Sequence, residues 1–318
     1  MKKRKSISYA KWGYIFLIPF FLVYAVFSLY PLISTFVTSF MDITVDQGFI
    51  SFSGEQEVNN GFCGLQNYTA VFTGEIGRSF YNTAVMWLLG FIPQIIISLL
   101  LAAWFTDLRL KIKAQGFFKA LIYLPNILMA SAVSYLFYGL FSMGGGIWTI
   151  INDITGYEGV LLDNAWGARS IVALINFLLW YGNTTILLMA AIMGVDTSLY
   201  ESAQIDGANS SQMFWKITMP LIRPILLYVL ITSLIGGIQM YDVPTLLATS
   251  TGYPGQSLLT LVMQIQNRKD ASPGIASAIC IVIFIVTAVL GGIIFYVTED
   301  RSDKRLARKR KKSAKEAV

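Results

Sequence analysis

The chain has 318 residues, of which 55% are hydrophobic and 13% charged, and its mean hydropathy is +0.60. This composition excludes a water-soluble globular domain and indicates an integral membrane protein. The formal net charge is +6 and the sequence contains no histidine, which excludes histidine zinc ligands, histidine general bases and histidine proton relays.

Six apolar runs are long enough to cross a bilayer core about 30 Å thick, which takes roughly 20 helical residues. The runs are continuous rather than alternating, and backbone groups in lipid must be satisfied within their own segment, so helices are predicted. The first run is too long for a signal-peptide core and is predicted to be retained, with Pro19 and Pro31 tilting, kinking or ending it. In chain order the predicted spans are 12–40, 80–105, 117–141, 171–193, 221–247 and 275–297.

The basic residues gather on one side of these spans. With the N-terminus inside, 20 of the 24 Lys and Arg residues fall on the cytoplasmic side, which predicts that both termini are cytoplasmic. The basic tails, 1–11 and 298–318, are interpreted as topology anchors, with contact to anionic membrane lipid as the alternative. The positive charge therefore does not indicate a nucleic-acid partner.

Three predicted outer segments, 41–79, 142–170 and 248–274, are too long for tight connectors and too short for a separate catalytic domain. They suit docking of another protein, although solvated connectors are an equally good interpretation. Cys63 is predicted outside and Cys280 within the last span, so the two are not expected to form a disulfide.

The predicted inner segment 194–219 carries signals for a helix, a turn and a second helix. Ser198 stands three residues before Glu201, which predicts a capping box. Gly207 predicts the end of the first helix, because glycine readily adopts a positive φ. One of the residues 209–211 (Asn, Ser, Ser) can cap the second helix, and Pro220 can open the next span.

The second of these helices carries Phe214 and Ile217, with Trp215 beside them, on one face. Such an apolar face fits either lipid headgroups or a groove on a partner protein. Glu201 also has two interpretations, the helix cap or an ion pair with a partner.

The spacing within 201–220 resembles the signature loop of the membrane subunits of ATP-binding-cassette importers. That signature reads Glu-Ala-Ala, three residues, Gly, nine residues, Ile, one residue, Leu-Pro. Here Glu201-Ser202-Ala203, Gly207, Ile217 and Met219-Pro220 keep every spacing, with Ser202 and Met219 as substitutions. The stretch 199–208, together with Phe214, Ile217, Pro220 and Pro224, is more similar to the carbohydrate branch, of the maltose-transporter type.

Further segments resemble sugar permeases. Residues 64–68 (Gly-Leu-Gln-Asn-Tyr) are similar to a Gly-Leu-Asx-Asn-Tyr segment, and Trp180 and Tyr241-Asp242 to the family's Trp and Phe-Asp positions. Residues 251–254 match the usual Gly-Gly-Pro only loosely.

The resemblance implies an all-α, six-span fold, the type I ABC importer permease fold, with a permease core over 80–297 and the first span outside a five-helix core. It implies that the inner loop is a coupling helix that sits in a cleft of an ATPase, so that ATP-driven closure moves the permease between inward- and outward-facing states. The partners implied are a second homologous permease, two ABC ATPases and an extracytoplasmic sugar-binding protein, at a bacterial plasma membrane. The residues implied in the ATPase contact are Glu201, Ser202, Ala203, Asp206, Gly207, Ala208, Phe214, Ile217 and Pro220.

The sequence has no phosphate-binding Gly-x-x-x-x-Gly-Lys-Ser/Thr loop and no Gly-x-Ser-x-Gly nucleophile elbow. ATP and Mg²⁺ are therefore expected on the separate ATPases. No bound cofactor, catalytic residue or metal site is expected in this chain.

Polar side chains inside apolar spans are costly in lipid and are candidates for a solute pathway. The alternative is that they only bond neighbouring helices. Gln239, Tyr241 and Asp242 are favoured because they cluster on the span that follows the inner loop, and Asn183 is added to them. The remaining candidates are Gln94, Asn126 and Asn176.

The predicted function is import of a sugar, in the first place an oligosaccharide. The alternatives are import of another solute, such as glycerol phosphate, peptides or polyamines, and, as a poorer fit, a secondary transporter or a channel.

Overall fold

The computed structural model describes residues 10–46, 56–107, 113–156, 159–251 and 255–298. Nearly all of the two predicted basic tails lies outside these residues. The chain divides into two compact units, 1–77 with 264–284 and 78–263 with 285–318. Within the described ranges, five helices are long and apolar enough to span a membrane, or six if one bent pair counts as a single span. The predicted helical membrane fold is confirmed.

In the first unit, the first predicted span is one continuous helical stretch. It consists of α1 (Ala10–Tyr24), a π-helical segment η1 (Ala25–Leu29) and α2 (Tyr30–Thr38). Neither Pro19 nor Pro31 ends it. The π segment directly precedes Pro31, and the Tyr30 amide donates to the Ala25 carbonyl across it, which lets the helix absorb an irregularity and continue.

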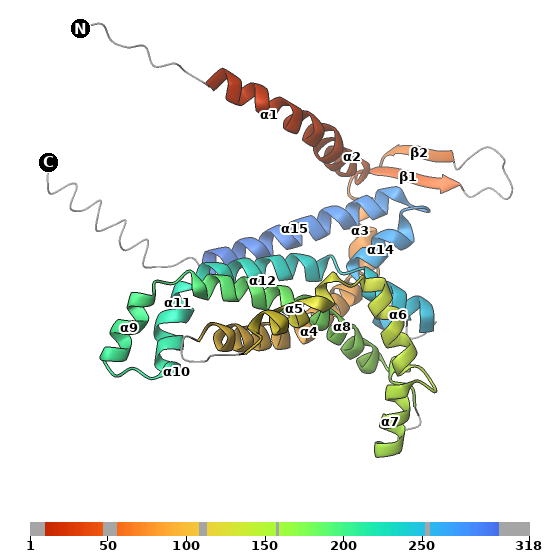
Figure 1. The fold of residues 1–318 in the computed structure, drawn as a ribbon. Coiled ribbons are helices and arrows are strands. Elements are labelled where there is room, and N and C mark those ends of the chain that lie inside the picture. The colour runs from red at the N-terminus through yellow and green to blue at the C-terminus, as the bar shows by residue number, and fades with distance from the viewer. Residues whose placement is uncertain (1–9, 47–55, 108–112, 157–158, 252–254, 299–318) are drawn as a thin grey trace, which may run out of the picture. The chain divides into compact units, whose positions relative to one another are not determined.

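The predicted outer segment 41–79 contains regular structure that hydropathy did not predict. Strands β1 (Met41–Asp46) and β2 (Gln56–Phe62) pair antiparallel, and α3 (Gln66–Thr73) follows (Figure 1). The Asn67 side chain donates to the carbonyls of Ser39, at 3.0 Å, and Met41, at 2.9 Å, and the Tyr68 hydroxyl lies 2.8 Å from the Ser39 hydroxyl. The 64–68 segment therefore fastens α3 to the end of α2 and the start of β1.

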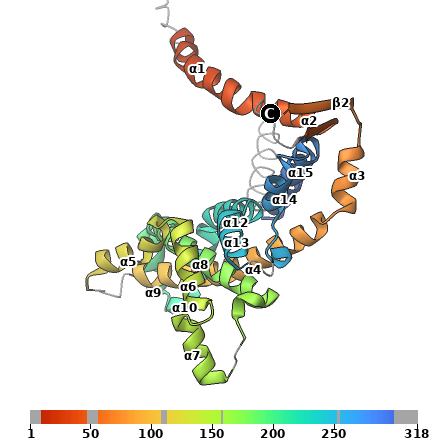
Figure 2. The ribbon, with the colours of Figure 1, turned by 90° about the vertical axis from the view of Figure 1, so that its right-hand side faces the viewer.

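The second unit holds most of the remaining helices, and Figure 2 shows α7 projecting from the rest of it. Helices α14 (Leu261–Arg268) and α15 (Pro273–Thr298) pass from one unit to the other. The other elements are α4 (Ile76–Thr106), α5 (Gln115–Ile127), α6 (Ala130–Phe141), α7 (Gly146–Thr155), η2 (Leu161–Asp163), α8 (Ala165–Met193), α9 (Thr197–Ile205), α10 (Ser210–Met213), η3 (Phe214–Thr218), α11 (Met219–Leu221), α12 (Arg223–Ile238), α13 (Asp242–Thr251) and η4 (Gly255–Ser257).

The predicted span 117–141 is not one continuous helix. Helix α5 ends at Ile127 and α6 begins at Ala130, and the stretches Gln115–Ile127 and Ala130–Thr155 are bent by 89° relative to each other. Leu128 and Met129 between them are extended, with ψ of 144° and 131°. Pro125 weakens the helix just before the break, because it has no amide N–H and its ring crowds the preceding turn.

The predicted span 221–247 is also interrupted. Helix α12 ends at Ile238 and α13 begins at Asp242. Gln239 is the C-cap of α12, and its backbone N–H donates to the carbonyls of Gly237 and Ile235. The span opens at Pro224, in the first turn of α12, while Pro220 opens the short helix α11 instead.

Buried Arg169 on α8 anchors the segment that follows residue 255. Its guanidinium donates to the Asn82 side chain at 2.7 Å and to the Ser257 carbonyl at 3.2 Å, and it stacks over the Trp166 ring at 5.3 Å. Asn82 in turn donates to the Leu259 carbonyl at 3.1 Å. The segment is therefore held to α4 and α8 by side chains far apart in sequence.

Candidate functional site

A polar cavity of about 390 Å³ lies where the two interrupted spans meet α8. Asn126, Leu128 and Ala130 reach it from the break between α5 and α6, and residues 239–243 from the break between α12 and α13. Irregular backbone at membrane depth is tolerated where it lines a cavity, and interrupted helices often form the solute sites of transporters. The cavity therefore has the construction of a solute site.

Three of the candidate polar side chains are hydrogen-bonded to other parts of the chain. Asn126 donates to the Leu179 carbonyl at 2.8 Å and Asn176 to the Val172 carbonyl at 3.0 Å. Gln94 does not line the cavity and donates to the Thr184 hydroxyl at 2.8 Å. Asn126 and Gln94 thus bond neighbouring helices, as the alternative interpretation has it, whereas Asn176 bonds a carbonyl of its own helix.

The four residues favoured for the pathway all line the cavity. Among the described residues, the side chains of Asn183, Gln239, Tyr241 and Asp242 have no hydrogen-bonding partner. Three of the four are exposed and Tyr241 is half-buried. Trp180, whose side chain is 52% exposed, lines the same cavity. Amide, phenol, carboxylate and indole groups are thus available together to a bound molecule.

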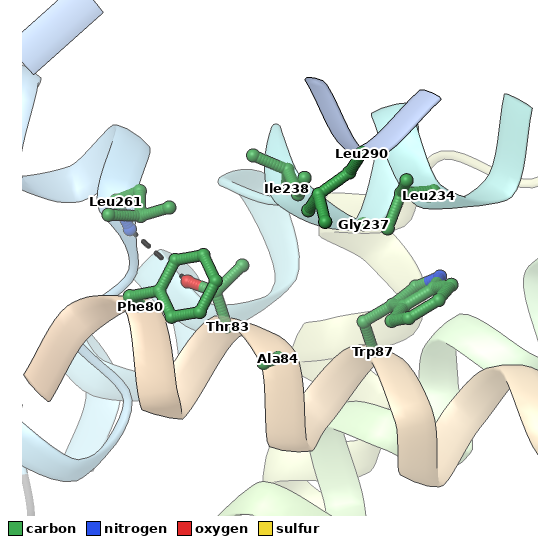
Figure 3. A pocket seen from close by; sticks show the side chains of 9 residues that line it. All are labelled: Phe80, Thr83, Ala84, Trp87, Leu234, Gly237, Ile238, Leu261 and Leu290. Carbon is green, nitrogen blue, oxygen red and sulfur yellow. Dashed lines mark hydrogen bonds between the residues drawn. The ribbon is translucent and has the colours of Figure 1, made fainter. Parts of the chain in front are cut away.

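A second cavity, of about 80 Å³, is apolar. Figure 3 shows Phe80 and Trp87 of α4 facing Leu234 and Ile238 of α12, with the Leu261 amide bonded to the Thr83 hydroxyl at 3.3 Å. Its size and lining make it a packing defect between helices and not a site for a polar solute.

A helical hairpin, residues 197–221, forms the other candidate site; in Figure 1 it lies at one end of the second unit, while α7 projects from the opposite end. The predicted capping box of Ser198 and Glu201 is wrong. The cap of α9 is Asp196, whose carboxylate accepts from the Ser198 amide at 2.9 Å. This hydrogen bond holds the pKa of Asp196 below its ordinary value. The Glu201 carboxylate is exposed and has no partner among the described residues.

The predicted end of the first helix at Gly207 is present, with φ at +77°. The Ala208 amide donates to the Ala203 carbonyl at 2.9 Å, and the Gly207 amide to the Gln204 carbonyl at 3.1 Å. These two bonds form a Schellman motif, which requires a left-handed residue at the glycine position. The spacing of Ala203, Gly207 and Ala208 is thus explained by one turn.

The second arm of the hairpin begins at Asn209, which forms a capping box with Gln212. Of the predicted apolar face, Phe214 and Ile217 are half-buried and Trp215 is exposed. The fully buried positions are Met213 and Thr218, because the π-helical segment η3 shifts the helical phase.

One contact joins the two arms of the hairpin, and a second joins its base to the membrane helices. The Tyr200 hydroxyl lies 2.8 Å from the hydroxyl of buried Thr218, which links α9 to η3. At the base, Val195 and Met219 pack on a buried cluster that includes Leu188 and Ile222. The hairpin is therefore one body continuous with α8 and α12.

One residue that sequence reasoning missed lies at the tip of the hairpin. The side chain of Ile205, at the end of α9, is 88% exposed. An apolar side chain beside a polar turn was a signal available in the sequence. The Ile205 side chain indicates a contact surface only once the turn is known to point outward.

Comparison with known proteins identifies the class. Residues 83–308 match the family model described as "Binding-protein-dependent transport system inner membrane component". The chain belongs to this family, whose members are transport permeases, and it is a multi-pass membrane protein.

Individual relatives agree. The lactose transport system permease protein LacF of Rhizobium radiobacter is 30% identical, with 91% of this chain and 94% of the relative covered. The arabinooligosaccharides transport system permease protein AraP of Bacillus subtilis (strain 168) is 31% identical over 87% of this chain and 85% of the relative. A chain of a bacterial ABC transporter involved in import of the acidic polysaccharide alginate has the same fold, with a TM-score of 0.67 at 22% identity over 90% of this chain and 94% of that one.

Proposed function

We propose that this chain is a permease subunit of an ATP-driven importer that carries a saccharide, in the first place an oligosaccharide, across a bacterial plasma membrane. The observation that carries the proposal is the cavity, where Asn183, Gln239, Tyr241 and Asp242 present unpaired polar atoms beside Trp180. Such a lining suits saccharides, because aromatic rings pack against their C–H faces while amides and carboxylates bond their hydroxyls.

The proposed assembly contains a second homologous permease, two ABC ATPases and an extracytoplasmic sugar-binding protein. The family description names dependence on a binding protein, and one solved alginate transporter with this fold is in complex with an alginate-bound periplasmic protein. ATP and Mg²⁺ bind the ATPases, so this chain contributes no catalytic residue.

The hairpin is proposed to dock on an ATPase. Exposed Ile205 and Glu201 give it a mixed apolar and acidic surface. Helix α12 has 16 residues and, at 1.5 Å per residue, spans about 24 Å. It connects the base of the hairpin directly to Gln239 at the cavity. Movement of the hairpin by the ATPase is thereby transmitted to the solute site.

Replacing Ile205 with Glu is expected to abolish co-purification of the ATPases and to reduce transport at least about tenfold, since burial of a new charge in the ATPase cleft is unfavourable. Gln204→Glu is the matched control: it adds the same charge at the neighbouring exposed residue and should retain most binding. Normal ATPase binding and transport by the Ile205→Glu complex would show that the tip touches lipid headgroups or solvent instead.

Replacing Tyr200 with Phe is expected to uncouple the complex. The change removes the hydrogen bond between α9 and η3, so the docked helix moves without carrying α12 with it. The measurement is the number of saccharides imported per ATP hydrolysed, which should fall severalfold while ATPase assembly stays intact. Ser202→Ala removes a bond internal to α9 and introduces the Ala that the importer signature has at this position, so it should leave this ratio unchanged. An equal effect of both changes would argue against the link.

A further inference from the structure

The charges around the polar cavity are unbalanced. Among the described residues that line it, Asp242 is a carboxylate, and there is no Lys or Arg. The other polar lining groups are uncharged amides, a phenol and an indole. A bound molecule thus meets acceptors and neutral donors, and one fixed negative charge.

The backbone at Asp242 gives no compensating anion site. Asp242 is the first residue of α13, and the first turn of a helix attracts anions through its unpaired N–H groups and the helix dipole. Here the first turn already carries the acidic residue Asp242. Pro244, in the same turn, supplies no N–H group.

An anionic group on the solute would therefore lie near Asp242 without a cation to neutralise it. Juxtaposed like charges are a usual way for a site to reject a competing ligand. A hydroxyl at the same place instead donates to the carboxylate and gains a charge-assisted hydrogen bond.

We propose that this cavity selects uncharged saccharides and rejects those that carry carboxylate, sulfonate or phosphate groups, with Asp242 as the specificity-determining residue. This inference rests on the proposed function. It separates this chain from the alginate importer with the same fold, whose solute is acidic.

The test uses the intact complex of permeases and ATPases, purified without the binding protein so that only the permease site selects. Calorimetry measures binding of four saccharide probes: maltotriose, arabinotriose, trigalacturonate and the uncharged trimethyl ester of trigalacturonate. The acid and its ester have the same rings and linkages and differ mainly in charge. Spermidine serves as the cationic probe.

The wild-type complex should bind at least one uncharged trisaccharide and should bind trigalacturonate at least about tenfold more weakly. Asp242→Asn should reduce this gap, the ratio of the two affinities, at least about threefold. Binding of the uncharged sugar should persist, which also shows that the variant folds. Asp153→Asn, which removes an acid from α7 and not from the cavity, should leave the difference in affinity between trigalacturonate and the uncharged sugar unchanged.

Two results overturn the inference alone: equal wild-type affinity for the acid and the uncharged trisaccharides, or an unchanged gap in Asp242→Asn. Failure of every saccharide to bind, with or without binding of spermidine, would overturn the proposed function and the inference with it.

Discussion

Replacing Gly207 with Val is expected to reduce transport-coupled ATP hydrolysis by about tenfold or more. Gly207 has φ of +77°, and a left-handed conformation costs a residue with a side chain roughly 1–2 kcal/mol, more when it is β-branched. The Schellman bonds from Ala208 and Gly207 would be lost with the turn. Ile205 and Glu201 would then no longer be presented together to the ATPase. The measurement is saccharide-stimulated ATPase activity of the purified complex.

Gly207→Asn is the control at the same position, because Asn is the other residue that tolerates the left-handed conformation. It should keep most of the coupling that Gly207→Val loses. If both variants were equally impaired, the side chain itself would be the obstacle and not the backbone conformation. Normal coupling in Gly207→Val would contradict the role of the turn.

Replacing Gly182 with Val is expected to have the largest effect on folding. Gly182 is buried on α8 where α5 crosses it, and a Cβ there would overlap the Ile122 carbonyl and lie 3.1 Å from the Tyr123 Cα. Both neighbours are backbone, so α5 itself must move. Overpacking of this kind costs typically 1–3 kcal/mol and occasionally more. The apparent Tm of the complex should fall by several degrees.

The displacement should also reach the solute site, because α5 carries Asn126 and α8 carries Trp180 into the cavity. Weaker saccharide binding is therefore expected beside the lower Tm. Gly139→Ala is the control: Gly139 is also inside a helix, but a Cβ there meets nothing within 4 Å. An unchanged Tm in Gly182→Val would contradict the close approach of α5 and α8.

Much of the membrane fold could be predicted from the sequence, because long apolar runs have few other stable arrangements in lipid. The breaks within two spans could not. Pro125 was a visible signal for the first, but it lies inside α5, and the extended residues Leu128 and Met129 are ordinary helix formers. At Gln239 and Tyr241 there is no proline or glycine at the break itself. Tertiary packing around the cavity decides both positions.

In the hairpin, too, some local features could not be predicted from the sequence. Asp196 and Ser198 are both good capping residues two positions apart. Which of them becomes the N-cap of α9 depends on the direction in which the chain leaves the end of α8. Gly207 was predictable because few residues other than glycine suit its conformation. Burial of Met213 and Thr218 was not, since it follows from a π-helical segment that apolar spacing does not reveal.

The polar residues predicted for the solute pathway fall into two groups, those bonded to the protein and those without a partner among the described residues. Cost in lipid singled out seven polar residues, and the structure gives helix-bonding roles to Gln94, Asn126 and Asn176. Asn183, Gln239, Tyr241 and Asp242 remain unpaired among the described residues. Sequence alone could not separate the two groups, because their partners come from other helices or from local carbonyls. The solute role of the four stays a prediction.

ATP-driven import of a saccharide is the proposed role of this permease. It is tested most directly by reconstituting the full complex in liposomes, with ATP on the side of the ATPases and saccharide-loaded binding protein on the other. Radiolabelled lactose, arabinotriose and maltotriose are offered in turn. At least one of them is expected to accumulate above its external concentration, and this accumulation should depend on ATP hydrolysis. Equilibration of the sugar without ATP, or ATP hydrolysis that moves none of them, would contradict it.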